Sequence, residues 1–357
     1  MKPNVFAPRI VIITSTFHPS IGGVEVIADT LAGTLAVRGC DVVVITRRAK
    51  SEINELSRPY KVRRVVKWRR AWSEIQSADL IIALGPVIEP LSYARLMRRP
   101  IIVSHHIAPS SGVIRSWFKN RFFSLLARRV VETACSKSLA TALRRPAVVV
   151  PNPLRYDFRR VERDRFRGSS ILFCGRLIPG KGLELLIDAF ARVIDRQPGA
   201  ALTILGEGPL REMLHRRVQT LGLESRVAII PSRSGVELQK LFCQHAVIVV
   251  PSICEESFGL VALEALASGC RVVVSDRGGL PEAVGKSGII VPPTLEALSE
   301  ALNTALVAAE FPMSGEELKA VQRHLDEHTP ERFVETILGL ASGCWPHLAI
   351  VLGKAEH

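Results

Sequence analysis

Short apolar runs alternate along the chain with longer segments in which apolar residues recur at helical spacing. In the first part of the chain the apolar runs lie at residues 9–14, 41–46, 80–84, 101–104, 131–135 and 148–150. They lack the alternation of apolar and polar positions that marks a strand with one face in water, so we expect strands covered on both faces. The succession of strand and helix predicts parallel βαβ units.

The succession breaks at residues 151–170 and then starts again. Pro151, Asn152 and Pro153 favour turns, and a charged stretch follows at 159–167. Beyond this break we expect strands at 170–174, 201–205, 227–230, 247–250 and 271–275, and helices at 183–195, 210–221, 235–244, 259–268, 295–308 and 331–340. Pro330 supports the start of the last helix, because proline suits the first helical position.

Two rounds of one pattern predict an α/β fold with two Rossmann-like, doubly wound domains. The first domain would span residues 1–165 and the second residues 166–328, and residues 329–357 would form a C-terminal helix and tail. A chain of 357 residues is too long for one ordinary core, which agrees with two domains. Domains of this kind place a ligand cleft where the carboxyl ends of their strands face each other.

The net charge of +13 is distributed unevenly along the chain. Residues 1–168 contain 30 Lys and Arg against 12 Asp and Glu, a net of +18, and the remainder contains 17 against 22, a net of −5. A strongly basic first half suggests an anionic partner, such as a phosphate-bearing substrate, a membrane surface or a nucleic acid.

The cysteines and the lengths of the apolar runs argue against a disulfide-rich, zinc-binding or membrane-spanning protein. The seven cysteines are odd in number, scattered and never in C-x-x-C spacing, which argues against a zinc site or a disulfide framework and indicates a reducing compartment. No stretch approaches 18 uninterrupted apolar residues, and the short apolar run at 10–13 lacks the length of a signal-peptide core. We therefore expect a cytoplasmic protein whose contact with a membrane, if any, is peripheral.

The segment Pro251–Glu264 carries the most specific chemical signal. It follows a strand and opens a helix, so Phe258, Gly259 and Leu260 would offer free N–H groups to an anion such as a diphosphate. Glu256 could accept hydrogen bonds from sugar hydroxyls. Glu264 would be buried in an apolar helix, where a carboxylate needs a partner, and ribose hydroxyls could supply one. A helix cap at Glu256 and an ordinary salt bridge at Glu264 are the alternative.

Residues 251–264 resemble the E-x7-E motif of the retaining GT-B glycosyltransferases of family 4. Three further segments resemble motifs of the same family in the same order: the strand–Gly-Arg–loop–Lys-Gly segment at 172–182, the Gly-x-Gly-Pro turn at 204–209 and the Gly-Gly-x-Pro-Glu segment at 275–282. The resemblance implies a GT-B fold, which leaves the C-terminal helix free to cross back to the first domain.

By this resemblance Arg176 and Lys181 would hold the donor diphosphate, where fixed cations stabilise a departing nucleoside diphosphate. Solvated surface cations are the alternative for both. The loop at 231–233 resembles the one that contacts the nucleobase, although a plain connecting loop is nearly as good an interpretation. The donor-binding set implied for the second domain is Gly175, Arg176, Lys181, Gly206, Arg233, Glu256, Ser257, Phe258, Gly259, Leu260 and Glu264.

The first domain carries two further matches. Gly22 and Gly23, between the first strand and its helix, resemble a Gly-Gly loop that approaches the donor phosphates, where glycine permits φ > 0 and close approach of the backbone. The family has a histidine at the end of the strand near residue 104, close to the donor sugar; we align His106 with it and keep His105 as the second choice. The implied catalytic set is therefore His106, Glu256, Arg176 and Lys181.

No D-x-D motif occurs in the sequence. Transferases that depend on a divalent cation would be expected to hold it through such carboxylates. We therefore expect a metal-free mechanism with no cofactor, in which the two cations replace Mg²⁺ and the nucleotide-sugar is a substrate.

Two basic regions rich in aromatic residues, at 61–72 and 114–131, suit an anionic membrane surface. A partly buried helix flanked by solvated charges explains the second region equally well, and nucleic-acid binding lacks a recognised motif.

The resemblance implies transfer of a sugar, with retention of configuration, from a UDP- or GDP-sugar to a glycan or lipid-linked acceptor in bacterial polysaccharide, lipopolysaccharide or glycolipid synthesis. Two alternatives stay open: a sugar-nucleotide epimerase on the same architecture, and a non-catalytic protein that binds a nucleotide-sugar.

Overall fold

The computed structural model describes residues 7–18, 22–47, 58–85, 87–107, 130–144, 146–155, 158 and 168–352. By its internal contacts the chain divides into two compact units. The first unit comprises residues 1–153 together with 329–357, and the second comprises residues 154–328. The change from one unit to the other thus falls in the segment where the sequence pattern breaks.

The first unit is built on a seven-stranded parallel sheet with the strand order β3-β2-β1-β4-β5-β6-β7. The strands are β1 (Arg9–Thr14), β2 (Asp41–Thr46), β3 (Lys61–Arg64), β4 (Leu80–Leu84), β5 (Ile101–His105), β6 (Val130–Ala134) and β7 (Val148–Val149). The chain starts at the centre, runs to one edge and returns past β1 to the other edge. The direction of winding therefore changes between β1 and β4, and this is where doubly wound sheets hold their ligands.

Helices cover the first sheet because alternate strand residues point to opposite faces. The helices described are α1 (Gly23–Val37), η2 (Trp68–Ala71), α2 (Trp72–Ser77), α3 (Ile88–Leu96), α5 (Lys137–Ala142), α13 (Pro330–Cys344) and α14 (Pro346–Leu352). Val11 and Ile13 pack with Trp68, Ile75 and Leu91, so η2, α2 and α3 share one face.

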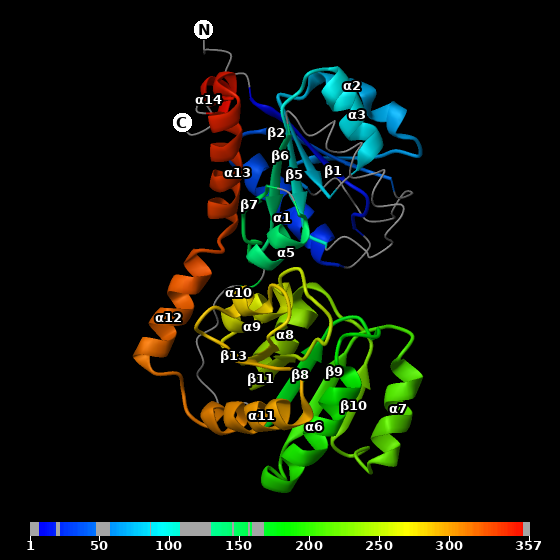
Figure 1. Ribbon diagram of the computed structural model, residues 1–357, viewed down its shortest axis with the longest axis vertical. Helices are drawn as coiled ribbons and strands as arrows, with labels where there is room; N and C mark the ends of the chain where they lie inside the picture. The colour runs from blue at the N-terminus through cyan, green and yellow to red at the C-terminus, as the bar shows by residue number, and fades with distance from the viewer. Residues whose placement is uncertain are drawn as a thin grey trace. The chain divides into compact units, whose positions relative to one another are not determined.

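The C-terminal helix returns to the first unit, as the GT-B interpretation allows. Helix α13 contacts both α1 and β6 and runs beside the first sheet (Figure 1). Arg38 of α1 donates to Glu335 of α13 over 2.5 Å. Phe333 and Ile337 of α13 are buried, so apolar contact fixes the helix there, and the exposed ion pair adds little.

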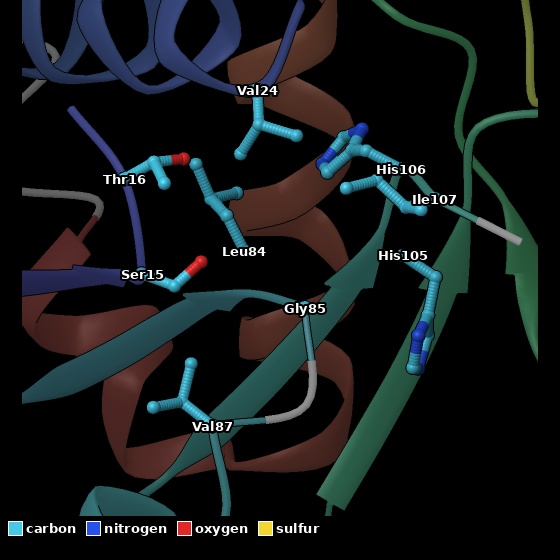
Figure 2. Close-up of a pocket in the computed structure, with 9 residues that line it drawn as sticks. All are labelled: Ser15, Thr16, Val24, Leu84, Gly85, Val87, His105, His106 and Ile107. Carbon is cyan, nitrogen blue, oxygen red and sulfur yellow. The ribbon is translucent and has the colours of Figure 1, made fainter. Parts of the chain in front are cut away.

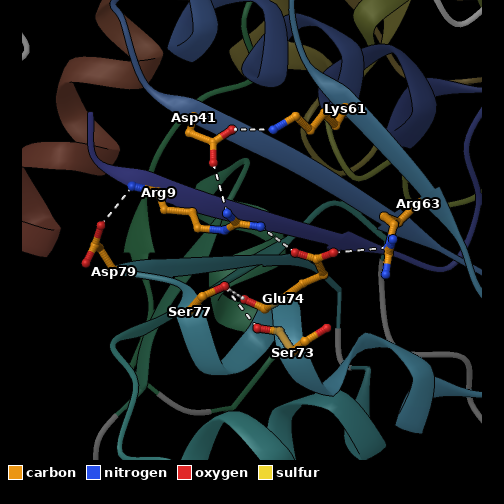
Figure 3. Close-up of polar contacts among 8 residues, drawn as sticks. All are labelled: Arg9, Asp41, Lys61, Arg63, Ser73, Glu74, Ser77 and Asp79. Atoms are coloured by element: carbon orange, nitrogen blue, oxygen red, sulfur yellow. Dashed lines mark hydrogen bonds and ion pairs between the residues drawn. The ribbon is translucent and has the colours of Figure 1, made fainter. Parts of the chain in front are cut away.

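A network of charges ties together the amino ends of the first three strands (Figure 3). Arg9 pairs with Asp41 at 3.1 Å and with Glu74 of α2, and its backbone N–H donates to the Asp79 carboxylate at 2.8 Å. Asp41 also pairs with Lys61 at 3.3 Å. The network lies at the amino ends of the strands, away from their carboxyl ends. Part of the basic region at 61–72 thus has a structural role in ion pairs within the first unit.

The second unit has a six-stranded parallel sheet with the order β10-β9-β8-β11-β12-β13. Its strands are β8 (Ser170–Cys174), β9 (Ala201–Leu205), β10 (Val227–Ile230), β11 (Val247–Val250), β12 (Arg271–Ser275) and β13 (Ile289–Val291). The winding changes direction between β8 and β11, so the loops that follow these two strands are the expected ligand site.

Helices again cover both faces of the second sheet. They are α6 (Leu183–Arg196), α7 (Arg211–Thr220), α8 (Gly235–Gln244), α9 (Leu260–Ala267), α10 (Leu280–Val284), α11 (Leu295–Ala309) and α12 (Gly315–Asp326). Side chains of α6, α7 and α11 form one apolar cluster with the strands, including Phe190, Leu214 and Leu302.

Every strand expected from the apolar runs is present, and among the described residues two further strands, β3 and β13, were not expected. Strand β3 lies at the edge of its sheet, where Lys61 and Arg63 are exposed and alternate with less exposed residues. Its sequence is therefore a basic run and lacks the apolar pattern that predicted the other strands. Strand β13 has only three residues. Helix α12 was also missed, although Ser314 and Glu317 form a capping box that marks its start.

None of the helices described is both long enough and apolar enough to cross a bilayer.

Candidate functional site

Two loops of the second unit meet at the point where its winding changes direction. One loop follows β8 and contains residues 175–182, and the other follows β11 and contains residues 251–259. The carbonyl oxygen of Gly180 accepts hydrogen bonds from Ile253 N at 2.8 Å and from Cys254 N at 3.1 Å. Two motifs that lie some seventy residues apart in the sequence are therefore joined through their backbones.

Gly182 allows the close approach of these loops. Its φ is +70°, and a Cβ atom at this position would lie 1.9 Å from the carbonyl oxygen of Pro251. No other residue fits this position without movement of the backbone, because both the conformation and the space exclude a side chain. The Gly-Lys-Gly sequence thus places Lys181 against the second loop.

Glu256 is the meeting point of the two loops. Its Oε1 atom accepts hydrogen bonds from Lys181 Nζ and from Ser252 Oγ, each at 2.5 Å. The side chains of Lys181 and Glu256 are 21% and 18% exposed, so both ends of this ion pair are reachable from solvent. Ser252 is held in turn because Ser275 Oγ donates to its carbonyl oxygen at 2.6 Å.

The Gly-Gly-x-Pro-Glu segment fixes the backbone of Glu256. Gly279 N donates to Glu256 O at 2.7 Å. Gly278 has a φ of +60°, and a Cβ atom there would lie 2.1 Å from Glu256 O. Three of the four motifs found in the sequence therefore meet at Glu256, one of them through its backbone.

Helix α9 begins next to this ion pair, one residue later than the sequence suggested. Gly259 is its N-cap residue, with φ of 120°, and as a glycine it has no side chain that could cap the helix. Phe258 is not part of the first turn: its side chain is buried, with its ring centroid 5.5 Å from that of His328. The first N–H groups of the helix, from Leu260 onward, remain suited to an anion.

The Gly-x-Gly-Pro turn supports the loop that carries Arg176. A Cβ atom on Gly206 would lie 1.9 Å from Gly175 O, and Leu177 N donates to Glu207 O at 2.8 Å. Arg176 itself is exposed, on the same loop as Lys181. The fourth motif thus acts as a backbone support, and the role of Arg176 toward the diphosphate stays a prediction.

Glu264 lies on the buried side of α9 and has a partner that the sequence did not reveal. Its side chain is 6% exposed, and Arg155 Nη1 lies 3.8 Å from its Oε1. The carboxylate is also close to Cys174 at the end of β8. Burial raises the pKa of the Cys174 thiol to about 12, and the negative charge of Glu264 adds to this rise.

Arg233 stands apart from these contacts. It follows β10, pairs with Glu237 of α8 at 3.5 Å and is 39% exposed. No contact described for its side chain reaches the two loops, so its role toward the nucleobase stays a prediction.

In the first unit a pocket of about 190 Å³ lies at the carboxyl ends of β1, β4 and β5. Its lining residues are Ser15, Thr16, Val24, Leu84, Gly85, Val87, His105, His106 and Ile107 (Figure 2). This is the point where the winding of the first sheet changes direction, so both units present a site at the topologically equivalent position.

The two histidines of this pocket have different surroundings. His105 Nε2 lies 3.0 Å from Glu132 Oε2, and both side chains are buried. His106 Nδ1 lies 2.8 Å from Asn152 Oδ1, whereas no group among the described residues bonds to its buried Nε2 atom. Figure 2 shows the His106 ring on the side of Val24 and the His105 ring turned the other way. If Nδ1–H donates to Asn152, Nε2 is a buried acceptor.

Burial lowers the pKa of His106 to about 4. In the unfolded chain the pKa of this histidine is about 6.5. Between about pH 4 and 6.5 the ring is therefore neutral in the folded chain and mostly protonated in the unfolded chain. Between these values the unfolded state binds more protons, so the stability falls as the pH drops from about 6.5 to about 4, by about 3 kcal/mol for this group.

We expect the urea midpoint of the wild type to fall more over this pH interval than that of His106→Gln. His215→Gln, which alters an exposed histidine of α7, serves as the matched control and should follow the wild type. Parallel pH profiles for the wild type and His106→Gln would show that the ring is not held neutral.

The Gly-Gly loop differs from the expectation of a left-handed conformation. Gly22 has φ of −177°, which is extended backbone, and it forms the N-cap of α1. A Cβ atom there would lie 2.6 Å from Glu25 Oε2, so the carboxylate of the first turn is what limits the space. Gly23 is the first residue of the helix. Residues 19–21, which complete the predicted loop, lie outside the described residues.

Residues that sequence reasoning missed are mainly those that hold the predicted ones. Ser252 lay within the quoted motif without a role, Asn152 was noted only as part of a turn, and neither Arg155 nor Glu132 was singled out. Of the two basic regions, 114–129 lies outside the described residues. In the other, Trp68 is buried in the core, whereas Trp72 is 39% exposed and packs edge-on against Tyr93.

Two family models match the chain. Residues 21–157 match the model described as Glycosyltransferase Family 4, and residues 168–307 match Glycosyl transferases group 1. An uncharacterized glycosyltransferase of Methanocaldococcus jannaschii is 40% identical over 130 residues, which are 36% of this chain and 33% of that protein. A D-inositol 3-phosphate glycosyltransferase of Corynebacterium glutamicum is 37% identical over 145 residues, 38% of this chain and 34% of that protein. The chain thus spans about a third of the length of these relatives.

Solved structures share the whole fold. The crystal structure of Anabaena HepE with UDP and glucose has a TM-score of 0.75 at 21% identity and covers 94% of this chain and 100% of that one. Sucrose-phosphate synthase from Thermosynechococcus elongatus has a TM-score of 0.76 at 20% identity, with 95% and 100% covered. The two family models follow each other along most of the chain, and the fold agrees with them. The chain therefore belongs to the GT-B glycosyltransferases, with a Glycosyltransferase Family 4 domain followed by a Glycosyl transferases group 1 domain.

Proposed function

We propose that this protein transfers a sugar from a nucleoside-diphosphate sugar to an acceptor hydroxyl with retention of configuration. The observation that carries the proposal is the Lys181–Glu256 ion pair, held between two loops at the start of α9. A cation, a carboxylate and the positive end of a helix lie together there. This combination suits a ligand that has a diphosphate next to a group rich in hydroxyls.

In this proposal the diphosphate binds to Lys181, Arg176 and the first N–H groups of α9. Charge builds up on the phosphate oxygens as the bond to the sugar breaks, and fixed cations stabilise that charge without reorganising. The two side chains would do what a divalent cation does in other transferases, so the mechanism needs no metal.

Donor binding would also exchange the partners of the ion pair. In the ligand-free chain Lys181 and Glu256 compensate each other's charge. A phosphate would take Lys181, and sugar hydroxyls would donate to Glu256, which Ser252 continues to orient. Glu264 would accept hydrogen bonds from the ribose.

His106 of the first unit would offer its neutral Nε2 to a hydroxyl of the donor sugar. A protonated ring could not accept this hydrogen bond, so its low pKa supports the role. No side chain is proposed as a covalent nucleophile; the leaving phosphate takes the proton of the acceptor hydroxyl.

Relatives guide the choice of donor to test. HepE was crystallised with UDP, with UDP and glucose and with UDP-glucose, and a mutant of TarM from S. aureus with UDP. A thermal-shift screen of UDP-, GDP- and ADP-sugars measures binding, because a ligand of the native state raises the melting temperature. Detection of a glycosylated product, with its anomeric configuration, then separates transfer from isomerisation of the donor or from binding alone. Failure of all three donors to bind would refute the proposal.

We also propose that the protein acts at the cytoplasmic face of an anionic membrane, in the synthesis of cell-surface glycans. Val66, which precedes Lys67, is 72% exposed, and Leu96 at the end of α3 is 74% exposed; α3 contacts η2, which contains Arg69 and Arg70. Exposed apolar side chains among cations suit an anionic lipid surface. Co-sedimentation with phosphatidylglycerol vesicles, and not with phosphatidylcholine vesicles, is the expected result; equal recovery with both would contradict the proposal.

A further inference from the structure

Glu264 presents a physical problem that its helix does not solve. It lies in α9 among apolar residues, and its side chain is 6% exposed. A carboxylate removed from water loses its hydration, and this loss must be compensated by a nearby cation or by hydrogen bonds. Helix α9 itself contains no basic residue, so any cation that compensates Glu264 has to come from another segment of the chain.

Arg155 is brought to Glu264 by a segment that is fixed to the second unit at several points. Leu154 N donates to His328 O at 2.7 Å, and within the segment a turn is closed by Phe158 N, which donates to Arg155 O at 3.1 Å. Phe158 is 1% exposed and packs edge-on against Phe242, with ring centroids 5.2 Å apart. The segment is thus docked on the second unit, and Arg155 is not a chance surface neighbour.

The guanidinium of Arg155 is itself held in place on two sides. It lies 5.2 Å above the Phe158 ring and 3.8 Å from Glu264 Oε1, and its side chain is 18% exposed. A planar guanidinium that stacks on a ring loses little freedom when it pairs with a carboxylate. The pair is close enough to the end of β8 for both charges to act on the Cys174 thiol.

We propose that Arg155 is a positioning residue for the ribose subsite: by pairing with Glu264 it orients this carboxylate to accept hydrogen bonds from the vicinal hydroxyls of the donor's ribose. This inference rests on the proposed function, because it takes Glu264 as the ribose-binding group. Arg155 acts through Glu264 and does not contact the nucleotide. Its loss should therefore weaken binding only of nucleotides that have the ribose hydroxyls.

The experiment compares the affinities for UDP and for 2′,3′-dideoxy-UDP by isothermal titration calorimetry, or for GDP and its dideoxy analogue where the donor screen selects guanine. We expect the wild type to prefer UDP. Arg155→Met should weaken UDP binding about tenfold, or ~1.4 kcal/mol, and change dideoxy-UDP binding less than about twofold. Glu264→Gln should do the same, and the double variant should lose no more than either single one.

Further variants separate positioning from a merely structural role. Arg155→Lys keeps the charge and should restore part of the preference for UDP. Arg192→Met removes an exposed arginine that pairs with Glu296 far from α9 in sequence, and it should bind both nucleotides like the wild type. Should Arg155→Met fail to fold, the double variant Arg155→Met/Glu264→Gln, which leaves no uncompensated charge, is measured in its place and should bind dideoxy-UDP normally without preferring UDP.

Three results would overturn the inference. These are an equal loss of both nucleotides in Arg155→Met, no change in either, and a wild type that does not distinguish the two. If the double variant is measured in place of Arg155→Met, a retained preference for UDP over dideoxy-UDP would also overturn the inference. A wild type that binds none of UDP, GDP and ADP would instead refute the proposed function, so the two failures can be told apart.

Discussion

Lys181→Met should reduce the rate of sugar transfer by about 10²–10³-fold and leave the fold intact, since removal of one fixed charge that stabilises a transition state has effects of this size. Of the two proposed cations, Lys181 is the one with a described contact to Glu256, at 2.5 Å. Methionine is an unbranched side chain only one atom shorter than lysine, so packing is largely preserved while the charge and its hydrogen bond to Glu256 are lost. The rate of product formation at saturating donor is the measurement.

The effect should appear mainly in kcat, because the charge on the leaving diphosphate grows as the bond breaks. Lys240→Met, which removes an exposed lysine of α8, is the matched control and should transfer sugar at the wild-type rate. An unchanged rate in Lys181→Met would mean that the Lys181–Glu256 pair only links the two loops.

A partner variant tests whether the two charges act together. Glu256→Gln should also reduce transfer strongly, because the amide lacks the charge that receives Lys181 and the sugar hydroxyls. Side chains that share one hydrogen-bond network are not additive. The double variant should therefore lose less than the product of the two single losses, and full additivity would indicate independent roles.

The fold was predictable from the sequence because buried parallel strands carry a strong signal. Strands β1, β2 and β4 are almost wholly buried, and each is one short run of apolar residues. Strand β3 lacked this signal because it is an edge strand with Lys61 and Arg63 at its exposed positions. Charged side chains on an edge strand hinder its pairing with strands of other molecules, so such a strand is not an apolar run.

The candidate site was predictable to the extent that its parts are backbone features. Glycines at 182, 206 and 278 are required by close approaches of one loop to another, and such glycines fall at fixed places in a motif. The contact between Lys181 and Glu256 could not be derived from spacing, since the two residues are 75 positions apart and meet through the order of the strands.

Partners from outside the motifs were beyond reach for the same reason. Arg155 lies in the segment that the sequence marked only as a break, and nothing in its neighbours points to a buried carboxylate 109 positions later. The burial of Glu264 did predict that a partner must exist, and ribose hydroxyls and an ordinary salt bridge were the two considered, without a residue named for the second. The sequence thus indicated that the Glu264 carboxylate requires a partner, but not that Arg155 is this partner.

Gly278→Ala should abolish donor binding and destabilise the second unit by about 3 kcal/mol or more, because it combines an unfavourable φ with a steric clash. At φ of +60° an added Cβ would lie 2.1 Å from Glu256 O and 2.6 Å from Glu256 N. These are backbone atoms, so the whole turn around Glu256 has to move. A displacement of about 1 Å at a reacting group can reduce a rate about 10²-fold.

Gly222→Ala is the matched control for the conformational part of this effect. Gly222 has φ of +66°, and a Cβ atom there would meet nothing within 4 Å. This variant should therefore lose only about 1–2 kcal/mol and keep its affinity for the nucleotide. Thermal unfolding and nucleotide titration of both variants separate the two contributions. If Gly278→Ala behaved like Gly222→Ala, the close packing of the Gly-Gly turn on Glu256 would not be what holds this carboxylate, and Ser252 with Lys181 would suffice to orient it.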